Sequence, residues 1–207
     1  MRLLSLALAS ATILVAAPAF AAPTVWEFDP SHSAATFAIK HMMVSTVRGE
    51  FGKISGSVTV EGTDWKTAKV QAVVDASSIN TREPKRDAHL KSADFFDVAK
   101  FPTLSFKSTS VVVSPTGLKL TGDLTIHGVT KSVTFDAAPL AKEIKSPFGK
   151  TVTATTATAK INRKDFGLVW NKPLEKAGGL LVGDDVTITL DIELNKQEAA
   201  PAAAGAK

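Results

Sequence analysis

Apolar and polar residues alternate along most of the chain. In the clearest example, Val186, Ile188, Leu190, Ile192 and Leu194 share one parity, and only Thr, Asp and Glu stand between them. A period of two is typical of a β-strand with one buried face and one exposed face. The pattern therefore predicts a half-buried strand over residues 186–194.

Similar runs predict an all-β domain with antiparallel strands. They occupy residues 24–28, 36–40, 69–74, 118–126 and 129–137, and three further strands are expected over residues 50–60, 103–113 and 151–161. His127 and Gly128 join two of the runs, and glycine favours the positive φ of a tight hairpin turn there. Within residues 103–113 the apolar parity changes after Phe106, which predicts a bulge or a sharp bend near Ser108.

Eight or nine such strands predict a closed antiparallel barrel. Closure removes the exposed edges of a sheet, and a barrel of about eight strands is either filled by side chains or holds one small ligand. Alternation shows which side chains face inward but does not show whether they fill the interior. The pattern therefore does not distinguish a filled barrel from a barrel that holds a ligand.

Two long segments without alternation separate the predicted strands. Residues 76–102 and 162–181 are longer than most connections in compact domains, and loops of that length are often functional. Residues 86–91 predict a helical turn or two within the first loop, and the second contains apolar side chains such as Leu168. We expect both loops to fold back over the mouth of the barrel.

Composition excludes several functions. The 207 residues include 24 Lys and Arg, 20 Asp and Glu, and no Cys, so disulfide frameworks, thiol catalysis and cysteine-based metal sites are excluded. The nearest basic cluster, Arg82, Lys85 and Arg86, contains acidic residues and is interpreted as a solvated loop face, so no nucleic-acid partner is expected. The four His residues belong to no recognised catalytic or zinc motif. We therefore expect no catalytic residues, no metal and no cofactor.

The first 21 residues predict a cleaved secretory signal peptide. Arg2 precedes an apolar run over residues 3–17, and residues 19–21 (Ala-Phe-Ala) match a small-x-small cleavage site. A membrane anchor is the alternative, but about 15 apolar residues are fewer than the ~20 that cross a bilayer. No later segment is predicted to span a membrane. Residues 22–197 are then expected to form one barrel domain, and the Ala/Pro-rich residues 198–207 a disordered tail.

Several ordered motifs extend over residues 24–195. They read Trp26-x-Phe28-Asp29-Pro30-x-His32-Ser33, Phe37-x-Ile39-x-His41-Met42, Gly49-x-Phe51, Arg86-Asp87-x-His89-Leu90-Lys91-Ser92-x-Asp94-Phe95-Phe96-Asp97, Leu124-Thr125-Ile126-His127-Gly128-Val129-Thr130, Arg163-x-Asp165-Phe166-Gly167 and Asp184-Asp185-Val186. In this order they resemble the YceI-like proteins, a polyisoprenoid-binding periplasmic family. The resemblance implies a lipocalin-like, extended antiparallel barrel around a long apolar tunnel.

The resemblance also implies what the tunnel holds, namely an amphiphilic lipid such as a polyisoprenoid, an isoprenoid quinone or a fatty-acid derivative. Together with the signal peptide, it predicts a periplasmic carrier that performs no catalysis, and it implies that a homodimer can form. Two alternatives stay open. One is an enzyme that acts on a lipid-like substrate through His41 or His89, and the other is a stress-linked envelope interaction protein with a filled barrel.

Candidate ligand-binding residues follow from parity and from the loops. Inward residues of the strands are expected to contact the lipid tail: Phe37, Ile39, Leu104, Phe106, Leu120, Leu124 and Phe135. Thioethers and rings conform to flexible chains, so a second set is expected near the mouth: Met43, Phe51, Phe95, Phe96, Phe166 and Trp170. A polar head group is expected to meet His41, Arg48 or His89. A plain packed core is the alternative for the apolar residues, and a hydrogen-bonded rim position is the alternative for His41.

Overall fold

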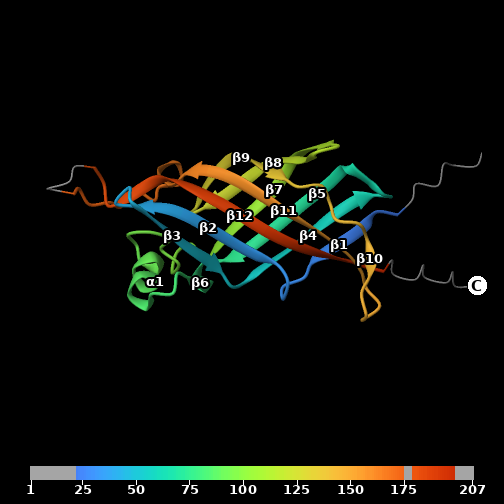
Figure 1. Cartoon of the computed structure of the whole chain (residues 1–207), viewed down its shortest axis with the longest axis horizontal. Coiled ribbons are helices and arrows are strands. Elements are labelled where there is room, and N and C mark those ends of the chain that lie inside the picture. The colour runs from blue at the N-terminus through green and yellow to red at the C-terminus, as the bar shows by residue number, and fades with distance from the viewer. Residues whose placement is uncertain (1–21, 175–178, 199–207) are drawn as a thin grey trace, which may run out of the picture.

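The computed structural model describes residues 22–174 and 179–198 (Figure 1). Their strands are β1 (Thr24–Phe28), β2 (Ala34–His41), β3 (Ser45–Phe51), β4 (Ile54–Glu61), β5 (Asp64–Asp75), β6 (Ile79–Asn80), β7 (Thr103–Ser114), β8 (Gly117–Ile126), β9 (Val129–Ala137), β10 (Ile144–Lys145), β11 (Thr151–Asn162) and β12 (Val182–Lys196). The helices are η1 (Ala76–Ser78), α1 (Pro84–Lys91) and η2 (Arg163–Phe166). The predicted signal peptide and residues 199–207 of the predicted tail lie outside the described residues, and both stay predictions.

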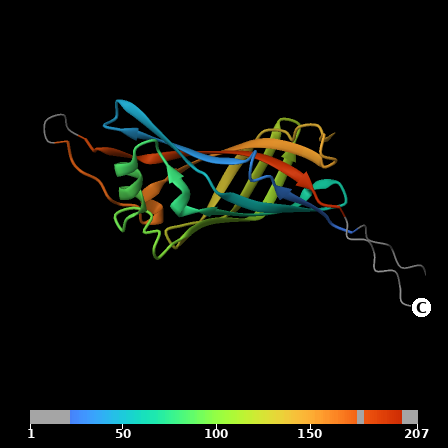
Figure 2. The same ribbon diagram turned by 90° about the horizontal axis from the view of Figure 1, so that it is seen from below.

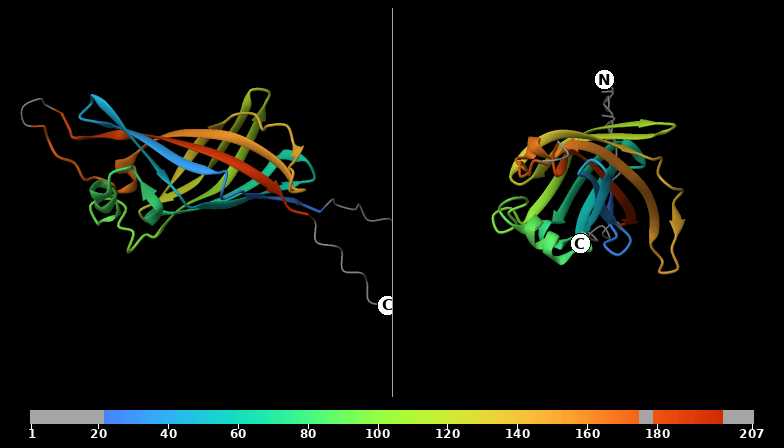
Figure 3. Two further views of the ribbon diagram at one scale, coloured as in Figure 1. Left: turned by 60° about the horizontal axis from the view of Figure 1, so that its bottom comes forward. Right: turned by 60° about the vertical axis from the view of Figure 1, so that its left-hand side comes forward.

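The strands close into a barrel through the long strand β12. One edge of β12 pairs with β11, and the opposite edge pairs with β2 and, further along, with β1. From β1 the pairing continues through β4, β5, β7, β8 and β9 to β11, so eight antiparallel strands form a closed ring. Figure 3 shows this ring along its length and obliquely from one end. The predicted antiparallel barrel of about eight strands is confirmed.

Strands β2, β3 and β6 lengthen one end of the barrel. β3 pairs with β2 along the whole length of β3, and β3 also pairs with β6 through Glu50↔Asn80 and Phe51↔Ile79. Figures 1 and 2 show these strands at the end where α1 lies, away from β1. The barrel is therefore elongated, as expected.

Two local predictions are confirmed. His127 and Gly128 have φ values of 52° and 74° and connect the paired residues Ile126 and Val129, as a tight hairpin requires. The register between β7 and β8 shifts between Ser108 and Ser110, where a bulge was expected.

The strand predicted over residues 50–60 is wrong, because the structure has two strands there. Phe51 ends β3 and Ile54 begins β4, and both side chains are buried. A continuous strand would turn residues three positions apart to opposite faces. The chain therefore leaves the sheet at Gly52 and Lys53, and the backbone N–H of Gly52 donates to the carbonyl of Ser78 at 3.2 Å.

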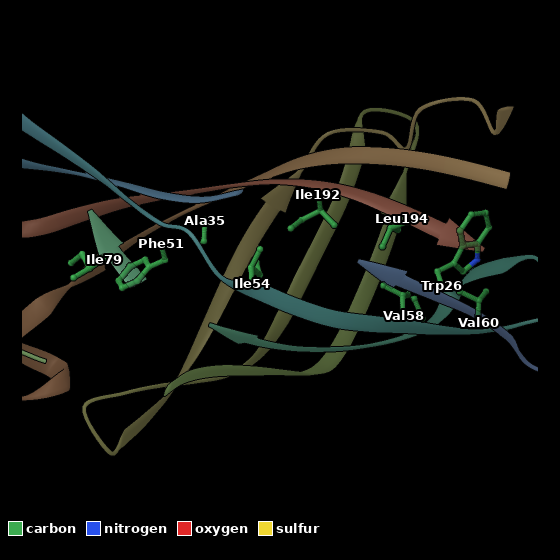
Figure 4. Close-up of a cluster of buried hydrophobic side chains, with 10 residues drawn as sticks. Trp26, Ala35, Phe51, Ile54, Val58, Val60, Ile79, Ile192 and Leu194 are labelled. Atoms are coloured by element: carbon green, nitrogen blue, oxygen red, sulfur yellow. The ribbon is translucent and has the colours of Figure 1, made fainter. Parts of the chain in front are cut away.

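Side chains fill the barrel at the end away from α1. Trp26, Val58, Val60 and Leu194 are each at most 5% exposed, and Figure 4 shows them pointing toward one another from β1, β4 and β12. The ring of Trp26 also packs against Trp65, with ring centroids 5.7 Å apart. This end of the barrel is a packed core.

Both long loops meet at the opposite end. Pro84 begins α1, and the side chain of Glu83 accepts a hydrogen bond from the backbone N–H of Lys85, which caps the helix. Trp170 of the second loop contacts His89 of α1, with ring centroids 4.8 Å apart. The helical turns predicted over residues 86–91 are confirmed, and the contact between the two loops is a further finding. Among the described residues, no helix has the length and apolar character that crossing a bilayer requires.

Candidate functional site

An apolar cavity of about 850 Å³ occupies the barrel end covered by α1. Inward residues of β2, β5, β7, β8 and β12 form its wall, and residues of α1 and of the two long loops form its rim. The exposed residues Glu83 and Lys85 also line the cavity, so it reaches solvent beside α1. Sites for small organic molecules usually measure about 300–1,000 Å³. The cavity therefore has the size and the lining of a site for one apolar ligand.

Most of the predicted binding residues line this cavity: Phe37, Ile39, His41, Phe51, His89, Phe95, Phe96, Leu104, Phe106, Leu124, Phe135 and Trp170. They come from both groups expected from the sequence, the inward strand residues and the loop residues. The structure brings these residues together, and their contact with a ligand stays a prediction.

Four predicted residues lie outside the lining. Met43 is 64% exposed in the turn after β2, and Arg48 is exposed because its neighbour Val47 takes the inward position in β3. Leu120 packs against the buried residues around Phe135, and Phe166 is 1% exposed within the packing behind the cavity wall. Nothing in the geometry places these four side chains against a ligand.

Sequence reasoning missed other lining residues. The largest group lies on β12 and just before it: Leu181, Val182, Val186, Ile188 and Leu190. The inward parity of residues 186–190 was the available signal, since the same alternation predicted their strand. Further apolar positions include Val47, Ile54, Val74, Leu90, Ile126, Ile161 and Leu168. Arg86, interpreted from the sequence as part of a solvated loop face, also lines the cavity, and that interpretation is wrong.

Two glycines allow aromatic rings to lie against the cavity wall. A Cβ atom on Gly49 of β3 would lie 2.5 Å from Cζ of Phe37, its cross-strand partner. A Cβ atom on Gly122 of β8 would likewise lie 2.5 Å from Cζ of Phe106. Glycine leaves room for close approach within a sheet. Both rings therefore cover the neighbouring strand instead of crossing the interior.

Three aromatic rings from both loops pack together at the rim. His89 lies edge-on to Phe95 and to Trp170, with centroid distances of 5.0 and 4.8 Å. Phe95 and Trp170 are also in contact, with centroids 5.2 Å apart. Nε2 of His89 lies 2.7 Å from the Asp94 carboxylate, which fixes the orientation of the imidazole. The Asp94 carboxylate therefore orients the His89 ring at the rim.

Arg163 ties the second loop to the start of β12. This residue is 3% exposed and donates to the carbonyls of Leu168, Trp170 and Gly183. Its Nη2 also lies 3.3 Å from Asp184. Burial lowers the pKa of the guanidinium from its ordinary value, and Asp184 partly opposes that effect. Arg163 therefore holds Leu168 and Trp170 in place at the rim.

One group of side chains outside the cavity has the residue types of a metal site. Within the described ranges, Asp29, His32 and Glu193 offer ligand atoms within 4.8 Å of one another. However, the Asp29 carboxylate already accepts bonds from the backbone N–H groups of Ser31 and His32 and from Asn195 Nδ2, at 2.8, 3.2 and 2.9 Å. The bond from Asn195 is the main reason that the pKa of Asp29 is lowered. The group thus closes the turn between β1 and β2.

An antiparallel barrel that is packed at one end and hollow at the other defines a lipocalin-like fold with an internal site. The chain belongs to the YceI-like family, because the model of the YceI-like domain matches residues 26–194. The resemblance found in the sequence motifs is confirmed.

Known relatives share this fold. The chain is 39% identical over 175 residues to the UPF0312 protein SA2479 of Staphylococcus aureus strain N315. The aligned region covers 84% of this chain and 99% of that protein. A solved YceI protein of Campylobacter jejuni is 28% identical with a TM-score of 0.64, over 77% of this chain and 90% of that one. A polyisoprenoid binding domain from Saccharophagus degradans, implicated in plant cell wall breakdown, is 15% identical with a TM-score of 0.58, over 83% of this chain and 98% of that domain.

Proposed function

We propose that the protein is a carrier that holds one amphiphilic lipid in its barrel, with the apolar tail in the cavity and the polar head at the rim beside α1. The observation that carries this proposal is the apolar cavity of about 850 Å³. The name of the Saccharophagus degradans domain supports a polyisoprenoid or a related chain, such as an isoprenoid quinone, as the ligand class. A fatty-acid derivative also combines an apolar tail with a polar head.

Burial of the tail supplies the binding energy. Each CH₂-sized group removed from water contributes about 0.8 kcal/mol, so about twenty groups contribute roughly 16 kcal/mol. Association costs about 4–15 kcal/mol. A cost of about 8 kcal/mol, within that range, leaves about 8 kcal/mol, which corresponds to micromolar binding. The apolar wall is therefore sufficient without a strong contact to the head group.

The hollow interior favours this reading over a filled barrel that only binds another protein. For the enzyme alternative, the pair to test is His89 and Asp94, whose closest side-chain atoms are 2.7 Å apart at the rim. Replacement of His89 by Ala would abolish turnover of a bound quinone or lipid if that alternative were correct. Unchanged ligand after hours with the wild-type protein would contradict it.

The direct test is to purify the full protein from the cells that produce it, extract it with organic solvent and identify the extract by mass spectrometry. We expect about one amphiphilic lipid per chain. Repeated preparations without stoichiometric lipid would contradict the proposal.

A matched pair of variants links the lipid to the cavity. Ala72 lines the cavity, whereas its neighbour Val73 points outward and is 44% exposed. We expect Ala72→Phe, which fills part of the cavity, to lower the amount of co-purified lipid. Val73→Phe adds a ring outside the barrel and should leave that amount unchanged.

Export to the periplasm is part of the proposal, and the pattern of residues 1–21 supports it. Intact-mass measurement of the protein from its native envelope should give a chain that begins at Ala22. A full-length chain found only in the cytoplasm would contradict export.

A further inference from the structure

Few charged side chains accompany the apolar residues that line the cavity. Lys40, Lys85, Arg86, Arg163 and Glu83 belong to the lining. Lys40 alternates with the inward residues Ile39 and His41, so its side chain has the outward parity of β2. Arg163 is neutralised by Asp184 and surrounded by carbonyl groups. Lys85 is exposed. Arg86 is the remaining cation, and it is half-buried.

The guanidinium of Arg86 is held by one residue. Its Nε donates to Oγ1 of Thr81 and its Nη2 to the carbonyl oxygen of Thr81, both at 2.7 Å. Thr81 is 3% exposed, and its backbone N–H and hydroxyl donate to Oδ1 of Asp87 at 2.8 and 2.5 Å. Thr81, which directly follows β6, also lies close to β3, because a Cβ atom on Gly49 would lie 2.8 Å from Cγ2 of Thr81. The guanidinium plane is therefore fixed against the cavity wall before a ligand arrives.

Within the described part of the chain, the charge of Arg86 has no direct partner. Over residues 22–174 and 179–198, no carboxylate oxygen lies within 4.0 Å of its guanidinium nitrogens, and Asp87 reaches it only through the Thr81 hydroxyl. Arg163 shows the contrast, since it has the carboxylate of Asp184 at 3.3 Å. A half-buried cation beside apolar side chains is stabilised by an anion, and a fixed guanidinium fork matches the paired oxygens of phosphate and carboxylate groups.

We infer that the lipid carries an anionic head group, a phosphate or a carboxylate, and that Arg86 binds it. This inference rests on the proposed function, because it concerns the head of the lipid whose tail fills the cavity. The rim beside α1, where the cavity reaches solvent, is where such a head would lie. A neutral head would accept a hydrogen bond from Arg86 but would leave its charge uncompensated.

The test compares two ligands with the same tail and different heads. Geranylgeranyl phosphate and geranylgeraniol are titrated into the lipid-free protein by calorimetry, and inorganic phosphate serves as a head without a tail. We expect wild type to bind the phosphate ester at least about 10-fold more tightly than the alcohol, a difference of about 1.4 kcal/mol. This preference should decrease with added salt, because charge interactions are screened.

Variants assign the preference to Arg86. Arg86→Gln should lose it while keeping the affinity for the alcohol, and Arg86→Lys, which keeps the charge without the fork, should retain part of it. Arg48→Gln removes an exposed cation outside the cavity and should bind both ligands like wild type. If Arg86→Gln does not fold, the comparison of Arg86→Lys with wild type decides.

The outcomes separate the inference from the proposed function. Equal binding of both ligands by wild type overturns the inference and leaves the carrier in place. Binding of neither ligand, together with no lipid in native extracts, overturns both. A preference that survives in Arg86→Gln, or a full preference in Arg86→Lys, overturns the role of the Arg86 fork. Inorganic phosphate that binds as tightly as the ester shows a free-phosphate site, and that also overturns the inference.

Discussion

Substitution of Phe106 by Ala tests whether this ring lines a cavity or belongs to a packed core. One side of the Phe106 ring lies against Gly122 and packs edge-on to Phe135, with ring centroids 5.4 Å apart, and the ring also lines the cavity. Phe→Ala in a filled core costs about 3–5 kcal/mol. A ring with no partner atoms on one side has fewer contacts to lose. In the lipid-free protein we therefore expect Phe106→Ala to cost less than about 3 kcal/mol.

Phe166 provides the matched control. It is 1% exposed, lies outside the cavity lining and packs with Leu124, Ile126 and Leu168. Phe166→Ala should therefore show the full cost of about 3–5 kcal/mol. The two variants remove the same atoms, so the difference between their unfolding free energies measures how far the environment of Phe106 is hollow.

The assay is denaturant unfolding of lipid-free wild type and both variants, with and without geranylgeraniol. A ligand at a hundred times its dissociation constant stabilises the folded state by about 2.7 kcal/mol. Phe106→Ala should lose part of this increment, because its cavity wall contacts the tail less well. The reasoning is refuted if Phe106→Ala costs as much as Phe166→Ala and lipid leaves the stability of wild type unchanged.

Three further predictions concern the residues that shape the cavity and its surroundings. Gly49→Ala should lower the free energy of unfolding by about 1–3 kcal/mol and weaken lipid binding, because its Cβ atom would lie 2.5 Å from Phe37. Gly52→Ala is the control and should change little in denaturant unfolding, because no atom lies nearer than 3.9 Å to its Cβ position. Equal effects of the two substitutions would contradict this prediction. Arg163→Met should cost about 3–5 kcal/mol in denaturant unfolding, because it removes the donor to three carbonyls, those of Leu168, Trp170 and Gly183, and each buried group left unsatisfied costs about 1–3 kcal/mol, whereas Asp184 keeps its bond from Lys164. The exposed pair Lys160 and Asp185 is the control, and its loss should cost at most about 1 kcal/mol. The lowered pKa of Asp29 stabilises the folded state above the ordinary Asp pKa, and that stability is lost as pH falls from about 4 towards the folded pKa. Asp29→Asn should therefore flatten the acid limb of a stability-against-pH curve, and an unchanged slope would count against this linkage.

Parity along the strands could be predicted from the sequence, but position along the barrel axis could not. Ile188 and Leu194 belong to the same alternating run of β12, and both face inward. Ile188 lines the cavity, whereas Leu194 lies in the packed core with Trp26. What separates them is the closure of one end by Trp26 and Trp65, a contact between residues 39 positions apart that no local pattern encodes. The sequence therefore predicted which residues of β12 face inward, but it did not predict which part of the barrel interior is hollow.

The contacts between side chains at the rim are even harder to predict from local sequence patterns. The position of His89 in the first loop did not reveal that its ring would pack against Trp170, because the two loops meet only when the barrel closes. Arg86 stands among charged neighbours that are typical of a solvated loop, yet Thr81 draws its guanidinium to the wall of the cavity. A wall built by period-two strands selects for apolar chains in general, since burial of CH₂ groups does not depend on which chain supplies them. Discrimination among lipids must then come from the rim, where the fixed polar groups lie. The residues whose contacts are hardest to predict from the sequence are therefore the ones that would determine which lipid binds.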